Sequence, residues 1–195
     1  MKTLVKVALI GTVLWFVLTR NNQVTLGPGV LAPNSPKQVT IQSPRQFSYE
    51  DYTITPLAKF QITAKILAKK KYSSGRESDL SPVDLALGWG RMSDESVLSA
   101  IDISQSNRWY RWWTDEFPIP RKEIETNSAN MHIVPADESI LSAINHAQAG
   151  EIIELRGKLI RVDAPDGWHW ASSLTRNDTG KRACELIWVE AFEVQ

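Results

Sequence analysis

The sequence has one cysteine among 195 residues and no excess of charge of either sign. A single cysteine excludes a disulfide within the chain and any zinc or iron–sulfur site built from several cysteines. The 22 basic and 22 acidic residues balance, which argues against a generic nucleic-acid binder, because such proteins usually carry a basic excess. Internal repeats and low-complexity tracts are also lacking. The 43% of hydrophobic and 23% of charged residues are typical of a globular protein.

Only the N-terminus carries a signal-type apolar run, and this run is short. Lys2 and Lys6 precede an uncharged stretch at 7–19 that ends at Arg20, which is the pattern of a signal segment. No small-residue cleavage motif ends the stretch and no cysteine follows it. An uncleaved signal anchor over 1–20 is therefore favoured over a cleaved signal peptide or a buried N-terminal helix.

The topology follows from the flanking charges. As a helix the apolar stretch is about 20 Å long, against a hydrocarbon core of about 30 Å, and a snorkelling Lys6 extends the span. The basic residues ahead of it predict a single pass through the inner membrane, with the C-terminal domain in the periplasm.

The rest of the chain divides into a linker and one domain. Residues 21–36 contain two glycines, three prolines and no charged residue, which predicts an extended linker. Residues 37–195 are then a soluble extracytoplasmic domain. Because the N-terminal part holds basic residues and no acid, the domain is mildly acidic and offers little attraction to nucleic acid or anionic lipid.

The domain reads as α+β and mainly antiparallel β. Apolar alternation and aromatic runs predict strands at 60–67, 108–113, 151–162, 168–175 and 183–192. In the 151–162 strand the apolar phase switches around Gly157, which indicates a bulge or a sharp bend. The last three of these strands, with a bent first member, resemble part of a small closed barrel of OB or SH3 type.

Two short helices are predicted within this domain. Ser93 is placed to cap a helix over 94–101, which has acids in its first turn. The second helix follows Pro135 and ends at Gly150, with an apolar stripe that includes Ile140 and Ile144. Residues 73–82 and 114–128 are predicted to be loops.

Several segments resemble a family of uncharacterised bacterial proteins with a single N-terminal membrane segment. The segments are DLALGWGRMSDESVL (84–98), DISQSNRWYRWW (102–113), NSANMHIVPA (127–136), GWHWASSLTRNDTG (167–180) and CELIWVE (184–190). Together they span most of residues 84–190. The resemblance implies a bacterial origin and a membrane anchor, and it implies no activity.

The chain contains eight tryptophans, and their spacing suggests a binding surface. On a strand, Trp109, Arg111 and Trp113 share one face, and Arg108, Tyr110 and Trp112 share the other. Arginines on both faces argue against burial of both, so one face is a candidate aromatic–arginine surface for a sugar, a peptide or a partner. The alternative is core packing with arginines over the rings. We include Trp168 and Trp170, which share a face opposite His169, in the same predicted surface.

Catalytic and metal-binding patterns are weak. Cys184 is a candidate nucleophile with His132 or His169 and an acid such as Asp178 or Glu185, but its apolar neighbours also suit a buried thiol. The histidines show no metal spacing. The glycines at 88 and 90 do not form a dinucleotide or phosphate motif. No metal, cofactor or catalytic residue is therefore assigned.

These observations favour a membrane-anchored, non-enzymatic binding or assembly module of the cell envelope. Its expected partners are the membrane, through the N-terminal helix, and a protein or glycan of the envelope. Two alternatives stay open: an envelope hydrolase that uses Cys184 and a histidine, and an OB-type single-strand nucleic-acid binder that uses tryptophan stacking and the lysines at 69–71. The mild acidity disfavours the second.

Overall fold

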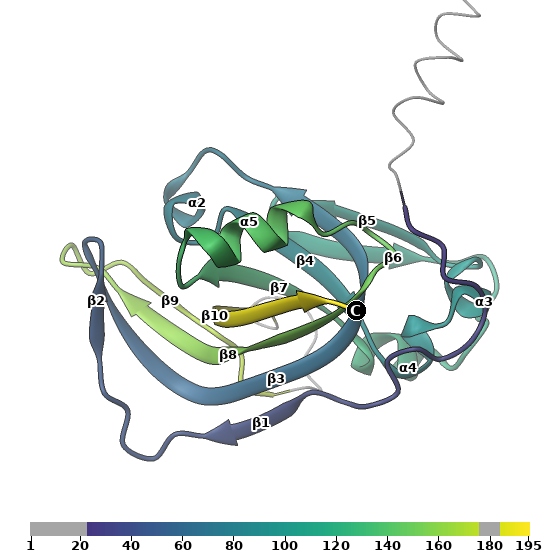
Figure 1. Ribbon diagram of the computed structural model, residues 1–195, viewed down its shortest axis with the longest axis horizontal. Coiled ribbons are helices and arrows are strands. Elements are labelled where there is room, and N and C mark those ends of the chain that lie inside the picture. The colour runs from purple at the N-terminus through teal and green to yellow at the C-terminus, as the bar shows by residue number, and fades with distance from the viewer. Residues whose placement is uncertain (1–22, 176–183) are drawn as a thin grey trace, which may run out of the picture.

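The computed structural model describes residues 23–175 and 184–195 (Figure 1). The signal anchor predicted over 1–20 lies outside the described residues. Within them, no helix has both the length and the apolar character needed to span a bilayer. The described chain is mainly antiparallel β with a few short helices, so the predicted α+β class is confirmed.

Short helices are interspersed among the strands of the described residues. In chain order they are β1 (Lys37–Thr40), β2 (Phe47–Tyr49), β3 (Tyr52–Lys71), α2 (Arg76–Leu80), β4 (Val83–Gly88), η1 (Gly90–Ser93), α3 (Glu95–Leu98), β5 (Asp102–Ser106), β6 (Trp109–Trp113), α4 (Arg121–Thr126), β7 (Ser128–Pro135), α5 (Glu138–His146), β8 (Ile152–Asp163), β9 (His169–Ala171) and β10 (Glu185–Val194).

The strand pairings close into a ring. β3, β4, β7, β10 and β8 pair in that order, and β8 pairs back with β3. All of these pairs are antiparallel except β7 with β10, which is parallel. β1 and β2 add to β3, and β9 adds to β8, while β5 and β6 form a separate hairpin (Figure 1). A closed ring of this kind is consistent with the predicted OB-like barrel.

β3 is much longer than the strand predicted at 60–67, and a bulge explains why its first half was missed. The register with β8 shifts between Pro56 and Ala58, so Leu57 is the extra residue. Proline is tolerated in a strand at such a bulge. The bulge also changes which face of β3 its side chains occupy. Pro56 pairs with Ile160, and Ala58 pairs with Leu159. Because Leu159 and Ile160 are neighbours in β8, they lie on opposite faces of that strand.

The bulge predicted near Gly157 is present, but it lies in the partner strand β10 and not in β8. β8 itself runs unbroken past Gly157, and the extra residue there lies in the partner strand, where the β10 register shifts between Val189 and Ala191. A Cβ on Gly157 would lie 2.0 Å from the Trp188 carbonyl oxygen. Glycine is therefore required for the close approach of β10, and not for a bend in β8.

Three hydrophobic clusters fill the molecule. The largest lies inside the ring and includes Phe60, Leu85 and Ile187, with Ile144 of α5 packed against it. The second lies beside β2 and β9 and is centred on Trp188, whose ring meets Phe47 at 5.1 Å and Tyr49 at 4.9 Å. The third lies beneath the β5–β6 hairpin and draws on β3, β4, η1, α3, α4 and the loops between them; its buried members are Leu67, Ala86, Met92, Val97, Ile101, Ile119 and Ile124.

The short helices agree only in part with the helices predicted from the sequence. α5 matches its prediction, because Asp137 caps it by accepting from the Ser139 and Ile140 backbone N–H groups. α3 is shorter than the predicted 94–101 helix, and Asp94 rather than Ser93 is its N-cap. α2 and α4 lie within the segments 73–82 and 114–128, which were predicted to be loops, so the expectation of only two helices is wrong.

Residues 23–36, predicted as a linker, run along η1 and α3. The Gly29 N–H donates to the Asp94 carboxylate at 2.9 Å, and the Ala32 N–H donates to the Ser93 hydroxyl at 3.0 Å. Ala32 is completely buried. The side chains of η1 and α3 thus bind the backbone of this segment, which we call the strap (residues 24–32).

We predict that the charge of Asp94 stabilises the strap. Hydrogen bonds from the Gly29 and Ser96 backbones lower the pKa of Asp94. A depressed native pKa contributes stability above the unfolded value of about 4, and this stability is lost as the pH falls through the native value. Asp94→Ala should therefore lower the urea midpoint at pH 7, and the difference from wild type should shrink below about pH 4.

Asp137→Ala is the matched control, because Asp137 caps α5 in the same way and accepts its hydrogen bonds from Ser139 and Ile140 rather than from the strap. Hydrogen exchange at pH 7 should speed up at 24–32 in Asp94→Ala and not in Asp137→Ala. A urea difference for Asp94→Ala that stays constant from pH 7 to pH 3 would contradict the assignment.

Candidate functional site

The β5–β6 hairpin has one exposed face and one face packed against the rest of the chain. The aromatic residues of β6 are therefore divided between an exposed surface and core packing, the two alternatives that the sequence left open. Trp109, Arg111 and Trp113 alternate along β6 as exposed residues, and Tyr110 and Trp112 alternate with them as half-buried residues. Trp113 is 58% exposed and Trp109 is 36% exposed. We call Trp109, Arg111 and Trp113 the hairpin face.

The opposite side of the hairpin packs onto the ring. Trp112 and Tyr110 lie against the third hydrophobic cluster. The Tyr110 hydroxyl lies 3.2 Å from the Ser128 hydroxyl of β7, and burial raises the pKa of Tyr110 to about 12. Gln105 donates to the Asn130 side-chain carbonyl at 2.7 Å. Trp112, which was predicted as a binding residue, therefore packs against the third hydrophobic cluster.

Arg108 lies in the hairpin turn rather than in the strand predicted over 108–113. Asn107 and Arg108 have φ values of 51° and 65°, the left-handed pair that a two-residue type I′ turn requires. Glycine usually takes the second position, and an arginine there is strained. The Arg108 N–H donates to the Tyr72 hydroxyl at 2.9 Å, and its guanidinium lies 3.9 Å from the Tyr72 ring centre. These contacts hold the strained residue in place.

The Arg108 side chain also reaches a buried carboxylate on β4. Its Nη1 donates to Asp84 Oδ1 at 2.8 Å and to the Ser81 carbonyl at 2.8 Å. The side chain of Asp84 is 1% exposed and that of Arg108 is 19% exposed. Asn130 donates to the other Asp84 oxygen at 3.3 Å. Both charges are largely removed from water, so each is stabilised mainly by the other.

His132 of β7 lies beside the same carboxylate. Its Nδ1 is 3.0 Å from Asp84 Oδ1, although the angle falls outside hydrogen-bond geometry and Nδ1 has no hydrogen-bond partner. The His132 side chain is 6% exposed. The Trp170 ring packs on the imidazole with centres 4.8 Å apart. Asp84, Arg108 and His132 form one buried polar cluster between the hairpin and the ring.

A groove of about 560 Å³ opens between the hairpin turn and the segment that links β8 to β10. It brings together Arg108, Trp109 and Trp170 of the predicted surface. It also holds Cys184, His132 and His169 of the thiol hypothesis, but not the suggested acid Glu185. Its lining is Glu77, Arg108, Trp109, His132, Arg161, His169, Trp170, Ala171, Ser172 and Cys184.

The remaining predicted surface residue, Trp168, lies outside the groove lining. Its ring meets Tyr52 at 6.0 Å and Trp170 at 6.3 Å, and the Arg76 guanidinium lies 4.7 Å from its centre. Arg76 is in turn held by a bidentate pair with Asp166. Trp168 therefore packs beside Trp170, outside the groove lining. Asp178, one of the acids suggested for Cys184, lies outside the described residues.

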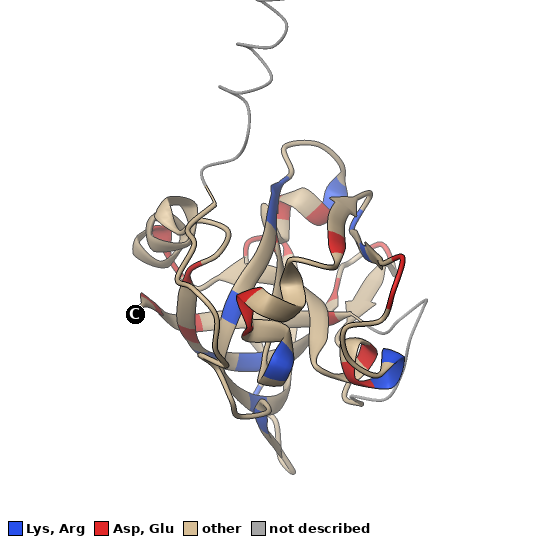
Figure 2. Cartoon of the chain, turned by 90° about the vertical axis from the view of Figure 1, so that its right-hand side faces the viewer, with Lys and Arg blue, Asp and Glu red and all other residues tan. Residues whose placement is uncertain are grey.

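The charges around the site are mixed in sign. Figure 2 shows Lys and Arg interspersed with Asp and Glu along one side of the chain. Arg108 is paired with Asp84, and Arg161 is paired with Asp163 at 2.7 Å. Arg111 differs, because it bonds the Ser106 hydroxyl at 2.8 Å and has no acidic partner among the described residues. The hairpin face thus presents one arginine that is available to an anionic group.

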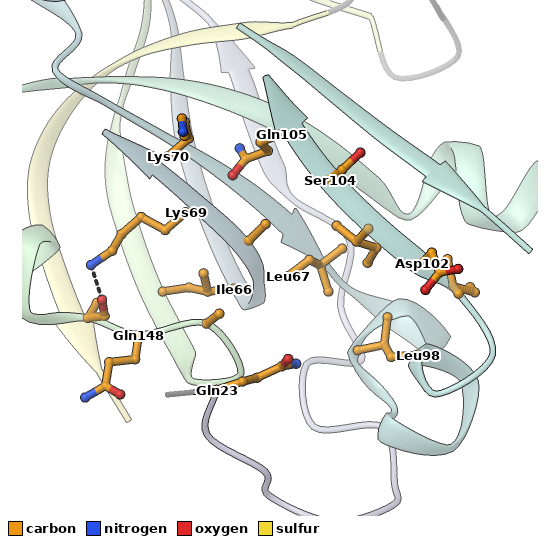
Figure 3. Close-up of a pocket in the computed structure, with 15 residues that line it drawn as sticks. Gln23, Ile66, Leu67, Lys69, Lys70, Leu98, Asp102, Ser104, Gln105 and Gln148 are labelled. Atoms are coloured by element: carbon orange, nitrogen blue, oxygen red, sulfur yellow. Dashed lines mark hydrogen bonds between the residues drawn. The ribbon is translucent and has the colours of Figure 1, made fainter. Parts of the chain in front are cut away.

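A larger pocket of about 810 Å³ lies between β3, β5 and the end of α5 (Figure 3). Lys69 points across it to the last turn of α5, where its ammonium donates to the Ile144, Asn145 and Ala147 carbonyls. A lysine at this position satisfies unpaired helix carbonyls, and burial lowers its pKa. Lys69 therefore has a structural role. The pocket is bounded by Gln23, the first described residue, and we assign it no ligand.

Sequence reasoning missed Asp84, Glu77 and Arg161. For Asp84 a signal was present, because it is the one acid in the apolar run 83–87, and strand alternation sets it apart from Val83 and Leu85. Only the fold reveals Glu77 and Arg161, which come from α2 and β8. No cluster of three or more potential metal ligands exists within 23–175 and 184–195.

Comparison of the chain with models of protein families, with curated proteins and with solved structures gives no match.

The Arg108–Asp84 pair should behave as a coupled unit. Removing one partner of a buried pair leaves an uncompensated charge, which costs about 3–5 kcal/mol. We expect Asp84→Asn and Arg108→Met each to destabilise the chain by an amount in or just below that range, and the double variant to cost clearly less than their sum. Urea unfolding of the full chain in detergent measures all three.

Arg161→Met is the matched control, because its pair with Asp163 is exposed at 45% and 37% and is screened by solvent, so its loss should leave the free energy of unfolding nearly unchanged. Additive effects of Asp84→Asn and Arg108→Met would show that the two residues act separately.

Proposed function

We propose that the protein is a binding module of the cell envelope and that the hairpin face, together with the adjoining groove, is its ligand surface. The observation that carries this proposal is the exposed Trp109–Arg111–Trp113 row on a hairpin whose other side is packed. Large exposed aromatics beside an arginine are enriched at binding hot spots. Trp109 belongs to both surfaces, so the row leads directly into the groove.

We also propose that the ring is an OB-like barrel. Its members in chain order are β3, β4, β7, β8 and β10, and the third and fifth pair in parallel. In OB folds, nucleic acids and oligosaccharides bind on the face of the second and third strands. Here that face belongs to β4 and β7, and Tyr110, Gln105 and Arg108 of the hairpin cover it.

This cover favours the envelope role over the nucleic-acid alternative. A single strand stacking on the usual OB face would have to displace the hairpin, with its buried ion pair and its share of the third cluster. Of the three lysines suggested for that role, Lys69 is engaged with the end of α5. The surface that the hairpin presents to solvent is the hairpin face. It has two tryptophans and one arginine, and not the row of basic residues that a nucleic-acid backbone would need.

The spacing of the row suits an extended polymer. Trp109 and Trp113 are four residues apart on one strand, which places them roughly 13 Å apart at about 3.4 Å per residue. Aromatic rings at this separation can stack on two units of a glycan or a peptide that are separated by intervening units, and Arg111 between them can pair with a carboxylate. The N-terminal anchor at 1–20 would hold this surface at the periplasmic side of the inner membrane.

The test is co-sedimentation of the full chain in detergent with purified bacterial cell-wall sacculi, an insoluble polymer of sugars and carboxylate-bearing peptides. We expect wild type to sediment with sacculi, and Trp113→Ala to weaken binding about tenfold or more, as expected for a hot-spot residue. Trp113 is the informative tryptophan because it is the most exposed, whereas Trp112→Ala would also disturb the packing.

Val39→Ala is the control, because Val39 is 64% exposed on β1 and outside both the hairpin face and the groove. It should bind like wild type. Wild type that stays in the supernatant, or equal binding by Trp113→Ala, would rule out the hairpin face as the cell-wall ligand surface.

A further inference from the structure

We propose that Cys184 is a nucleophilic thiol, with His132 as its base and Asp84 as the residue that positions His132. This site goes beyond the proposed binding function and does not involve Arg111 or Trp113, so either proposal can fail without the other. If both hold, the groove adds acyl-transfer chemistry to a binding module.

The topology places the thiol and the imidazole on the same side of neighbouring strands. β10 and β7 are parallel, with Glu185 beside Met131 and Leu186 beside His132. Side chains alternate along a strand, so Cys184, two residues before Leu186, falls on the face that carries His132. Cys184 and His132 both line the groove. They are far apart in sequence, and the parallel pairing of β7 and β10 brings them to the same groove.

His132 is oriented as a general base requires. Its Nδ1 is turned toward Asp84 at 3.0 Å, which leaves Nε2 on the other side of the ring, where the residue borders the groove. A carboxylate beside Nδ1–H keeps the proton there and leaves Nε2 free to accept one. The Nδ1 contact is poorly aligned, as catalytic contacts often are before a substrate binds.

Asp84 is itself fixed from several directions. Arg108 holds Oδ1 at 2.8 Å, and Asn130 donates to Oδ2 at 3.3 Å. Trp170 packs against the His132 ring, with ring centres 4.8 Å apart. The carboxylate and the ring therefore have little freedom to rearrange, which is the support that an acid–base pair needs.

The charged and titratable groups around His132 come from five elements and are partly balanced. Beyond Asp84 of β4 they are Glu77 of α2, Arg108 of the hairpin turn, Arg161 of β8 and His169 of β9. Arg161 is already paired with Asp163.

The chemistry is transfer of an acyl group from an ester. His132 Nε2 takes the proton from the Cys184 thiol, and the thiolate sulfur forms a bond to the ester carbonyl carbon. The carbon–oxygen bond to the alcohol then breaks, and the alcohol leaves with the proton from His132. Water hydrolyses the thioester, giving a carboxylic acid and restoring the thiol. Trp109 and Trp170 in the lining favour an ester with a flat apolar part.

The chain has one cysteine, so thiol labelling reports on Cys184 alone. The experiment follows alkylation of the full chain by iodoacetamide from pH 5 to pH 9, and acylation by p-nitrophenyl acetate, both by intact mass. The variant is His132→Phe, which keeps a ring against Trp170. His146→Phe is the matched control, because His146 is exposed on α5 and lies outside the groove.

We expect wild type and His146→Phe to react at pH 7 at least about tenfold faster than His132→Phe in both reactions. Their alkylation should already be fast well below pH 8.5, where an ordinary thiol is half-ionised. A packing role of His132 would not move this pH profile. Equal rates in wild type and folded His132→Phe would overturn the proposal. If His132→Phe does not fold, a wild-type profile that rises only near pH 8.5 would overturn it.

Discussion

The ion pair between Arg108 and Asp84 is the interaction on which the rest of the structure depends. It joins the turn of the β5–β6 hairpin to β4 across a distance of 2.8 Å, with one partner almost fully buried. Arg108 also keeps a left-handed backbone that a non-glycine residue adopts only at a cost. The pair seats the hairpin on the ring, and in doing so it covers one surface, exposes another and fixes the carboxylate beside His132.

The seating of the hairpin on the ring gives the two sides of β6 different roles. Side chains on one side of β6 complete a hydrophobic cluster, while those on the other side remain in solvent. A packed inner side holds the exposed row rigid, so ordering that row on binding costs little entropy. The same seating leaves a groove at the hairpin turn, where residues from α2, β7, β8 and β9 meet.

The sequence predicted the elements with a strong local signal. The helix at Glu138–His146 has a cap and an apolar stripe, and β8 has clear alternation, so both were found. The first half of β3 was missed because Pro56 marks a bulge that only the pairing with β8 explains. The alternation of Trp109 to Trp113 along β6 was predicted correctly, although Arg108 lies in the turn. Which face is buried depends on the long-range contact with β4. Asp84 and His132 were not linked, because strand pairing brings them together.

The most direct test of this account is hydrogen–deuterium exchange of the full chain in detergent, comparing wild type with Arg108→Met. If the ion pair seats the hairpin, amides in 102–113 will lose protection in the variant while those of β3, β8 and β10 keep theirs. Unchanged protection of 102–113 in Arg108→Met would contradict the account, because the hairpin would then be held by its apolar contacts alone.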